Sequence, residues 1–182
     1  MSERARNDED WLQRLRDRAG EGGVPGALSL AATGEPLVEV EPENAREVLG
    51  RLRDDPDLAL HRLVDLTAID RWGSSAEGSG RFVVVYALES PESGRRMGVC
   101  VVPRDGEAGG DGASEAPELE SVVSLWPAAD WLEREVFDLF GIRFHGHPDL
   151  RRILLEADFE GAPLRKDHPR QPGLPLPGEA AS

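Results

Sequence analysis

The chain has 182 residues, of which 39% are hydrophobic and 31% charged, and its formal net charge at pH 7 is −14. This length fits one domain with extensions, and the acidic excess argues against non-specific binding to nucleic acid or to anionic lipid. The single cysteine, Cys100, excludes an intrachain disulfide and any iron–sulfur or all-thiolate zinc site made by this chain alone.

The N-terminal region is predicted to be an extension of the folded domain. Residues 8–19 place Trp11 and Leu15 on one helical face, and the glycine-rich residues 20–26 then break the pattern. We therefore expect residues 1–26 to be loosely attached, within a variable and partly disordered extension that spans residues 1–36. The charged start lacks the apolar core of a signal peptide.

Compact structure is expected to begin near Leu37, where the residues LVEV alternate as a strand. A helix should follow, with Asn44 and Glu47 as a capping box and residues 54–56 as its end. The apolar face of this helix has helical spacing and consists of Ala45, Val48, Leu49 and Leu52.

The middle of the chain is predicted to form strands. Residues 81–89 are almost continuously apolar and β-branched, as is typical of a strand buried on both faces, and residues 96–103 should pair with them antiparallel. Residues 104–118 are acidic, glycine-rich and without aromatic residues, so we expect a flexible, solvated loop. Residues 61–70 should form another strand, whose core positions are Leu63, Val64, Leu66 and Ile69.

The best-defined helix is predicted to begin at Asp130, with Glu133 as its capping partner, and to stop at Gly141. The order of elements predicts an α+β fold, a mixed β-sheet with helices packed on one face. Residues 37–144 would form this domain, and residues 145–182 an extended tail that binds a partner. The buried stripe of the helix should consist of Leu132, Val136, Leu139 and Phe140.

Most catalytic chemistry is disfavoured by the sequence. It contains no glycine-rich loop of the kinds that bind nucleotides. Glu133 and Glu135 point to opposite sides of a helix, so they cannot form a catalytic dyad. His145, His147 and His168 make a candidate metal site, but no carboxylate has the spacing of known zinc motifs, which favours imidazoles hydrogen-bonded at an interface.

Two pairs of adjacent cations lie in the tail, Arg151 with Arg152 and Arg165 with Lys166. Proteins that bind single-stranded nucleic acid interleave such cations with aromatic residues, whereas aromatic residues make up only 5% of this acidic chain. Since arginine is enriched at protein interfaces, we expect these side chains to form ion pairs with a partner protein.

A family resemblance is carried by EREVFDLFGIRFHGHPDLRRIL followed by GAPLRKDHP. These residues closely resemble the signature of the C subunit of proton-pumping NADH:quinone oxidoreductase, respiratory complex I. The similarity extends back through DLTAID and RFVVVYALE and covers residues 37–169. The chain departs from the usual pattern at Glu156, Phe159 and Ala162, where the family often has Pro, Trp and His.

The resemblance implies a non-catalytic peripheral-arm subunit that binds no cofactor and docks on the D subunit of the complex, which helps to form the quinone site. The holoenzyme would use FMN, iron–sulfur clusters, NADH and quinone, and would couple electron transfer to proton translocation. The chain would lie at the cytoplasmic face of the inner membrane, attached only through the complex. The implied partner interface consists of Glu133, Arg134, Glu135, Asp138, Phe140, Gly141, His147, Pro148, Asp149, Arg151, Arg152, Leu154, Pro163, Leu164, Arg165, Lys166 and Asp167.

Two alternatives remain open. The same fold would suit the equivalent subunit of a membrane-bound hydrogenase or of a ferredoxin-dependent complex, and the three tail histidines would suit a free-standing metal enzyme. If the tail is an interface, replacing Arg151 or Arg165 with alanine should leave the stability of the isolated domain nearly unchanged. Deleting residues 104–118 should likewise be tolerated.

Overall fold

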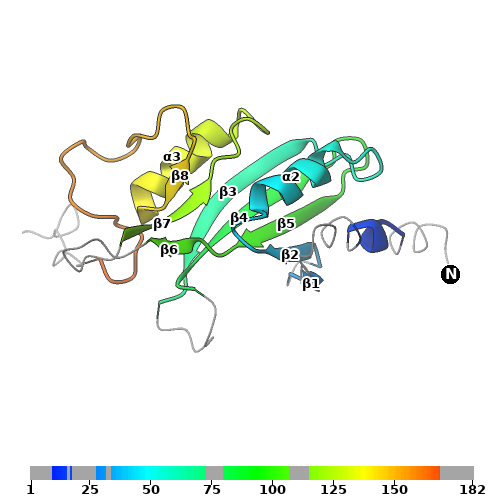
Figure 1. Ribbon diagram of the computed structural model, residues 1–182, viewed down its shortest axis with the longest axis horizontal. Coiled ribbons are helices and arrows are strands. Elements are labelled where there is room, and N and C mark those ends of the chain that lie inside the picture. Colours follow the sequence, from blue (N-terminus) through cyan, green and yellow to red (C-terminus); the bar gives the residue numbers. More distant parts are fainter. Residues whose placement is uncertain are drawn as a thin grey trace, which may run out of the picture.

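The structure is a computed structural model, and two β-sheets with helices beside them make up its folded part (Figure 1). The helices are α2 (Ala45–Asp54) and α3 (Ala129–Phe140). This arrangement confirms the predicted α+β class. The structure describes residues 10–15, 17, 28–31, 34–72, 80–106 and 115–168.

The larger sheet has five strands in the order β1–β2–β5–β4–β3. Neighbouring strands pair antiparallel except β2 and β5, which are parallel, so the sheet is mixed as predicted. Strand β4 lies inside the sheet and is mostly buried, which confirms its predicted character. The strands span Leu28–Leu30 (β1), Pro36–Val40 (β2), Arg62–Asp70 (β3), Phe82–Glu89 (β4) and Arg96–Val101 (β5).

Strand β3 buries a different set of side chains from the one expected. Its register with β4 shifts between Leu63 and Asp65, which is the mark of a β-bulge. Because of the extra residue, Leu63 and Leu66 both face the core although they are three positions apart. Val64 and Ile69 are 44% and 49% exposed, so their assignment to the core was wrong.

Helix α2 packs with its apolar face on the core, as predicted (Figure 1). It ends at Asp54, before Pro56, also as predicted. The capping box is not formed, because Asn44 keeps helical backbone angles and its side chain makes no cap hydrogen bond. The buried positions are Ala45, Val48, Leu49 and Leu52.

The smaller sheet consists of β6 (Arg104–Gly106), β7 (Glu115–Glu120) and β8 (Arg143–His145), in that order. The expected loop over residues 104–118 is therefore wrong at both ends, while residues 107–114 lie outside the described residues. Residues 115–120 form a strand because β8, which comes later in the chain after α3, pairs with them. Deleting residues 104–118 would remove β6 and most of β7, so we no longer expect that deletion to be tolerated.

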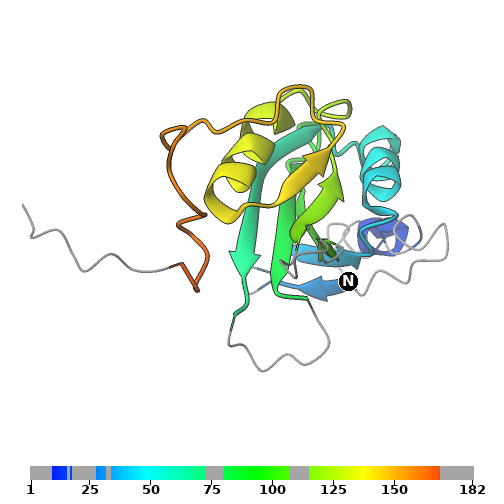
Figure 2. The ribbon, with the colours of Figure 1, turned by 60° about the vertical axis from the view of Figure 1, so that its left-hand side comes forward.

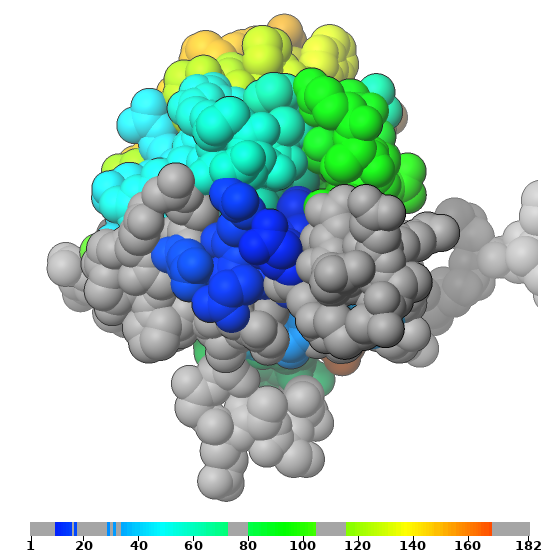
Figure 3. Space-filling model, turned by 90° about the vertical axis from the view of Figure 1, so that its right-hand side faces the viewer, coloured from blue at the N-terminus to red at the C-terminus, as the bar shows by residue number. Residues whose placement is uncertain are grey.

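The chain before Leu37 contributes more to the core than expected. Residues 10–15 are helical and lie against the rest of the domain (Figure 3, blue). Trp11 and Leu15, which are 6% and 0% exposed, belong to the apolar core. Strand β1 also joins the larger sheet. These parts pack on the domain and are not loosely attached, and the glycine-rich residues 20–26 lie outside the described residues.

Helix α3 ends as predicted and begins differently. Gly141 follows it in the left-handed conformation, with a φ of 70°, and donates its N–H to the Phe137 carbonyl. Asp130 is not the N-cap, which is Ala128, and Leu132 and Leu139 of the expected stripe are only half-buried. The buried residues are Ala129, Glu133, Arg134, Val136, Asp138 and Phe140. Among the helices that the structure describes, none has the length and apolar character needed to cross a bilayer.

Candidate partner-binding surface

The tail, here residues 146–168, follows α3 and then returns to the end of the β3–β4 pair (Figures 1 and 2, orange). Arg134 Nε of α3 donates to the Arg151 carbonyl at 3.1 Å. The Leu164 N–H donates to the carbonyl of Leu139, near the end of the helix, also at 3.1 Å. The tail and α3 therefore form one layer. Residues 169–182 of the predicted tail lie outside the described residues.

The first attachment point of the tail is Asp138, whose side chain is fully buried. Its Oδ2 accepts the backbone N–H groups of Ile153, Leu154 and Leu155 at 3.0, 2.8 and 3.0 Å, and its Oδ1 accepts Arg152 Nη1 at 2.7 Å. Burial alone would raise the pKa of Asp138, but these hydrogen bonds hold it below its ordinary value. We call these five residues the Asp138 anchor.

Arg152 also closes the loop that follows this anchor. Its Nη2 donates to the carbonyls of Phe159 and Gly161, both at 3.0 Å. The guanidinium carbon lies 5.9 Å from the centroid of the Phe159 ring. Backbone carbonyls inside a loop need donors, and this side chain supplies them. Arg152 is thus bonded within the chain, in contrast to its predicted pairing with a partner.

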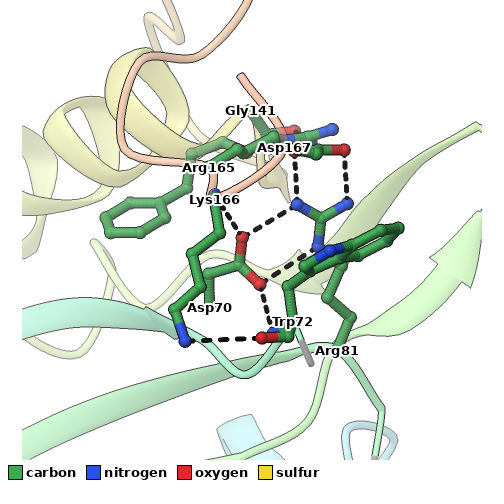
Figure 4. Close-up of polar contacts among 8 residues, drawn as sticks. Asp70, Trp72, Arg81, Gly141, Arg165, Lys166 and Asp167 are labelled. Carbon is green, nitrogen blue, oxygen red and sulfur yellow. Dashed lines mark hydrogen bonds and ion pairs between the residues drawn. The ribbon is translucent and has the colours of Figure 1, made fainter. Parts of the chain in front are cut away.

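The second attachment point is Arg81, at the start of β4 (Figure 4). Its Nη1 donates to Asp167 Oδ2 at 2.8 Å, its Nη2 to Asp70 Oδ2 at 2.8 Å and its Nε to Asp70 Oδ1 at 3.1 Å. Asp70 also accepts the backbone N–H groups of Lys166 and Trp72, at 2.8 and 2.9 Å. Pairing with Arg81 lowers the pKa of Asp70 far below its ordinary value. We call Asp70, Arg81 and Asp167 the Arg81 anchor.

Arg165 lies between the end of α3 and β4. Its Nε donates to the Phe140 carbonyl, and its guanidinium carbon is 5.1 Å from the centroid of the Phe82 ring. Gly141 has a positive φ, which favours glycine, and a Cβ atom there would lie 2.8 Å from Arg165 Nη2, so a larger residue would have to displace the end of the Arg165 side chain. Arg165→Ala should therefore weaken tail packing, contrary to the expectation that it would leave stability nearly unchanged.

Glu133 is fully buried in α3. Its carboxylate accepts hydrogen bonds from Ser121 Oγ and from the Val122 N–H, both at 2.7 Å. Burial raises the pKa of Glu133 to about 7, and the nearby charge of Asp130 adds to the shift. Its role is thus to join α3 to the turn after β7, which replaces the predicted capping role. Glu135 is exposed, so the two carboxylates do lie apart.

The three histidines of the predicted metal site are not brought together. His145 contacts Glu118, and His168 stacks on Phe159 at 5.9 Å between ring centroids. His147 is buried, with its Nε2 3.0 Å from the Asp130 carbonyl. Across the part of the chain that the structure describes, no group of three or more His, Cys, Asp or Glu side chains is arranged to hold a metal ion. The metal-enzyme alternative therefore finds no support.

The predicted interface residues divide into two groups. Those exposed are Glu135, Pro148, Asp149, Arg151, Leu154, Leu164, Lys166 and Asp167. Those buried or half-buried within this chain are Glu133, Arg134, Asp138, Phe140, Gly141, His147, Arg152, Pro163 and Arg165. The second group lies against the rest of this chain, and Asp167 of the first group is bonded to Arg81. The other exposed residues are left to present a surface.

Three large apolar side chains of α3 and the tail are exposed. Trp131, Leu154 and Leu164 are 65%, 60% and 51% exposed. The Arg151 side chain is 70% exposed and pairs with Asp149. We call Trp131, Arg151, Leu154 and Leu164 the docking face. Sequence reasoning missed Trp131, although an aromatic residue outside the apolar stripe of a helix was a usable signal.

Comparison with known proteins points to one family. The model of the family described as the 30 Kd subunit of respiratory-chain NADH dehydrogenase matches residues 38–173. The C subunit of NADH-quinone oxidoreductase from Methylobacterium sp. (strain 4-46) is 42% identical over 160 residues, which are 87% of this chain and 67% of the relative. The Thiobacillus denitrificans protein of that name is 43% identical over 138 residues, 75% of this chain and 65% of the relative.

Two solved structures share the fold. A trypsin-resistant fragment (1–134) of Nqo5 superposes with a TM-score of 0.63 at 32% identity, over 77% of this chain and 99% of the fragment. A chain of the membrane-bound sulfane sulfur reductase, an archaeal respiratory membrane complex, superposes with a TM-score of 0.65 over 88% of this chain and 84% of that chain. At 24% identity the second likeness shows the fold alone.

Proposed function

The chain belongs to the family of the 30-kDa subunit of respiratory-chain NADH dehydrogenase, and from this membership we propose its working role. It is a peripheral-arm subunit of NADH:quinone oxidoreductase. We propose that it docks on the quinone-site subunit of that complex, at the cytoplasmic face of the membrane. There it would support electron transfer from NADH to quinone, coupled to proton translocation, while FMN and the iron–sulfur clusters are held by other chains.

The observation that carries this proposal is the docking face. Its apolar members, Trp131, Leu154 and Leu164, are more than half exposed on a layer held by buried polar anchors. Large apolar side chains that a chain leaves exposed are often protein interface residues. Aromatic and arginine side chains are the commonest strong contributors to binding there, and Trp131 and Arg151 are of these types.

Arg151 is the arginine best suited to meet the partner. Arg134, Arg152 and Arg165 donate to carbonyls of this chain. Removing such a donor would leave buried acceptors unsatisfied before any partner is present. Arg151 is 70% exposed, so its guanidinium can form a planar, two-bond pair with a partner carboxylate. We therefore propose Arg151 as the charged contact of the docking face.

Binding of the purified full chain to the quinone-site subunit of the same organism tests the proposal. Trp131→Ala and Leu154→Ser should each weaken the affinity about tenfold, as expected when a well-buried interface side chain is lost. Their melting temperatures should stay close to that of the wild type, because both side chains are mostly exposed in the free chain. Val64→Ser, which removes an exposed apolar side chain from β3, is the matched control.

Equal losses in all three variants, or no loss in any, would contradict the docking face. The alternative assemblies are distinguished by the partners that copurify after gentle extraction of the membrane. Hydrogenase subunits in place of the NADH-oxidising module would favour the alternative.

A further inference from the structure

We infer that Arg81, which lies outside the tail, positions Leu164 of the docking face before any partner binds. This inference rests on the proposed docking function. It concerns the free chain, in which the tail already lies on α3. The tail would then offer a preformed surface to its partner, without a folding step at the moment of binding.

The geometry of Arg81 suits such a role. Its guanidinium bridges Asp70 of β3 and Asp167 of the tail with four hydrogen bonds, two to each carboxylate. Its guanidinium carbon lies 4.4 Å from the Trp72 ring centroid and 4.7 Å from that of Phe82. A planar group held by bonds at its edge and by rings at its faces has little freedom to turn. Arg81 therefore fixes Asp167 relative to the sheet (Figure 4).

The two anchors hold different members of the docking face. Leu154 donates its own N–H to the Asp138 anchor. Leu164 lies three residues before Asp167 and donates its N–H to the Leu139 carbonyl. The backbone N–H of Lys166, the residue before Asp167, donates to Asp70. Loss of Arg81 should therefore release Leu164 while Leu154 stays in place.

Arg81 is expected to raise the fraction of chains whose tail is ordered and therefore able to bind the partner. When only an ordered tail binds, the apparent dissociation constant equals the intrinsic one divided by the ordered fraction. The shape of the docking face and its contacts need not change. Positioning by Arg81 would act through this fraction, so its loss should slow association with the partner and leave dissociation nearly unchanged.

Residue-resolved amide hydrogen exchange on the free, full chain tests the inference without a partner. In Arg81→Ala the amides of Leu164 and Lys166 should exchange at least about tenfold faster, whereas those of Leu154 and Leu155 keep their wild-type rates. Arg62→Ala is the matched control, because Arg62 is an exposed arginine of β3 that pairs with Glu89. It should change none of these amides.

Asp167→Asn is the second variant, in case Arg81→Ala fails to fold around the buried Asp70. It weakens only the tail side of the network and should reproduce the faster exchange at Leu164 and Lys166. Unchanged exchange in a folded variant, or the same change in the Arg62 control, overturns the inference.

Affinity for the quinone-site subunit gives the second readout. For either variant it should fall by the same factor as the ordered fraction measured by exchange. A measurable fall in the ordered fraction with unchanged affinity overturns the positioning role. If Trp131→Ala and Leu154→Ser also bind normally, the proposed function has failed, and the exchange result still describes what holds the tail.

Discussion

The larger sheet with α2 and the tail are attached to the molecule in different ways. The sheet and α2 bury apolar side chains such as Leu49, Tyr86 and Val99, all of them 0% exposed. Among the apolar residues from Gly146 to His168, only Ala162 is buried. The tail is instead bonded through the carboxylates of Asp138 and Asp70 and through arginines.

This difference implies different modes of failure. Apolar burial is non-directional and shared by many neighbours, so its loss is felt by the whole fold. Charged hydrogen bonds depend on single atoms, and a segment held by a few of them can detach while the rest stays folded. Detachment also lets the freed groups bond to water, which limits the energetic loss.

The largest expected effect is on the sheet side. Leu49→Ala removes a fully buried side chain of α2 and should lower the free energy of unfolding by about 2–5 kcal/mol. Urea unfolding followed by tryptophan fluorescence and by circular dichroism should shift equally with both probes. Shifts that differ between probes would show that the core does not unfold as one unit.

A smaller and local effect is expected at the Asp138 anchor. Asp138→Ala removes the side-chain acceptor of three backbone N–H groups and one of the acceptors of Arg152, at a cost of up to about 3 kcal/mol. Amide exchange at Ile153, Leu154 and Leu155 should accelerate, while amides of α2 keep their protection. The exposed Asp149→Ala should change neither, and a global loss of protection in Asp138→Ala would remove the distinction between the two regions.

Glu133 adds to the comparison between the apolar core and the tail, because it is an ionisable side chain that is buried outside the tail. Its pKa in the folded chain is raised to about 7 from an ordinary 4.5, so folding favours its protonated form. The resulting stability is fully present below pH 4.5 and is lost as the pH rises through 7. At pH 8, Glu133→Gln should therefore be more stable than the wild type, by at most about 3 kcal/mol.

An amide at this position can still accept from Val122 and meet Ser121, so its hydrogen bonds survive. Denaturation curves measured from pH 5 to 8 check the prediction. The exposed Glu135→Gln should retain the wild-type pH dependence. A wild-type slope in Glu133→Gln would assign the pH dependence to another group.

Features set by neighbouring residues were predictable from the sequence. The apolar stripe of α2, the internal strand β4 and the stop at Gly141 each follow from spacing or from one residue type. Features set by distant residues were not. The bulge at Val64 needs the register with β4, and β7 needs β8 as its partner.

The candidate site divides in the same way. The signature residues of the tail were identified, but whether each faces inward or outward depends on where the tail lies. Arg152 and Arg165 resemble surface residues until Asp138 and the Phe140 carbonyl are brought beside them. Trp131 is the converse, an aromatic residue that folding leaves outside. Contact of the docking face with a partner stays a prediction.

The Asp138 anchor combines an anion-binding bend of the backbone and the carboxylate that occupies it in one polypeptide. Successive backbone N–H groups that converge on one oxygen form the kind of nest that many proteins use to capture phosphate or sulfate. Here the host is the bend at Ile153–Leu155 and the guest is a carboxylate tethered to the same backbone. Because the tether makes the encounter intramolecular, occupancy of the nest is independent of any solute and of dilution. The Asp138 carboxylate thus serves as a built-in ligand of this bend.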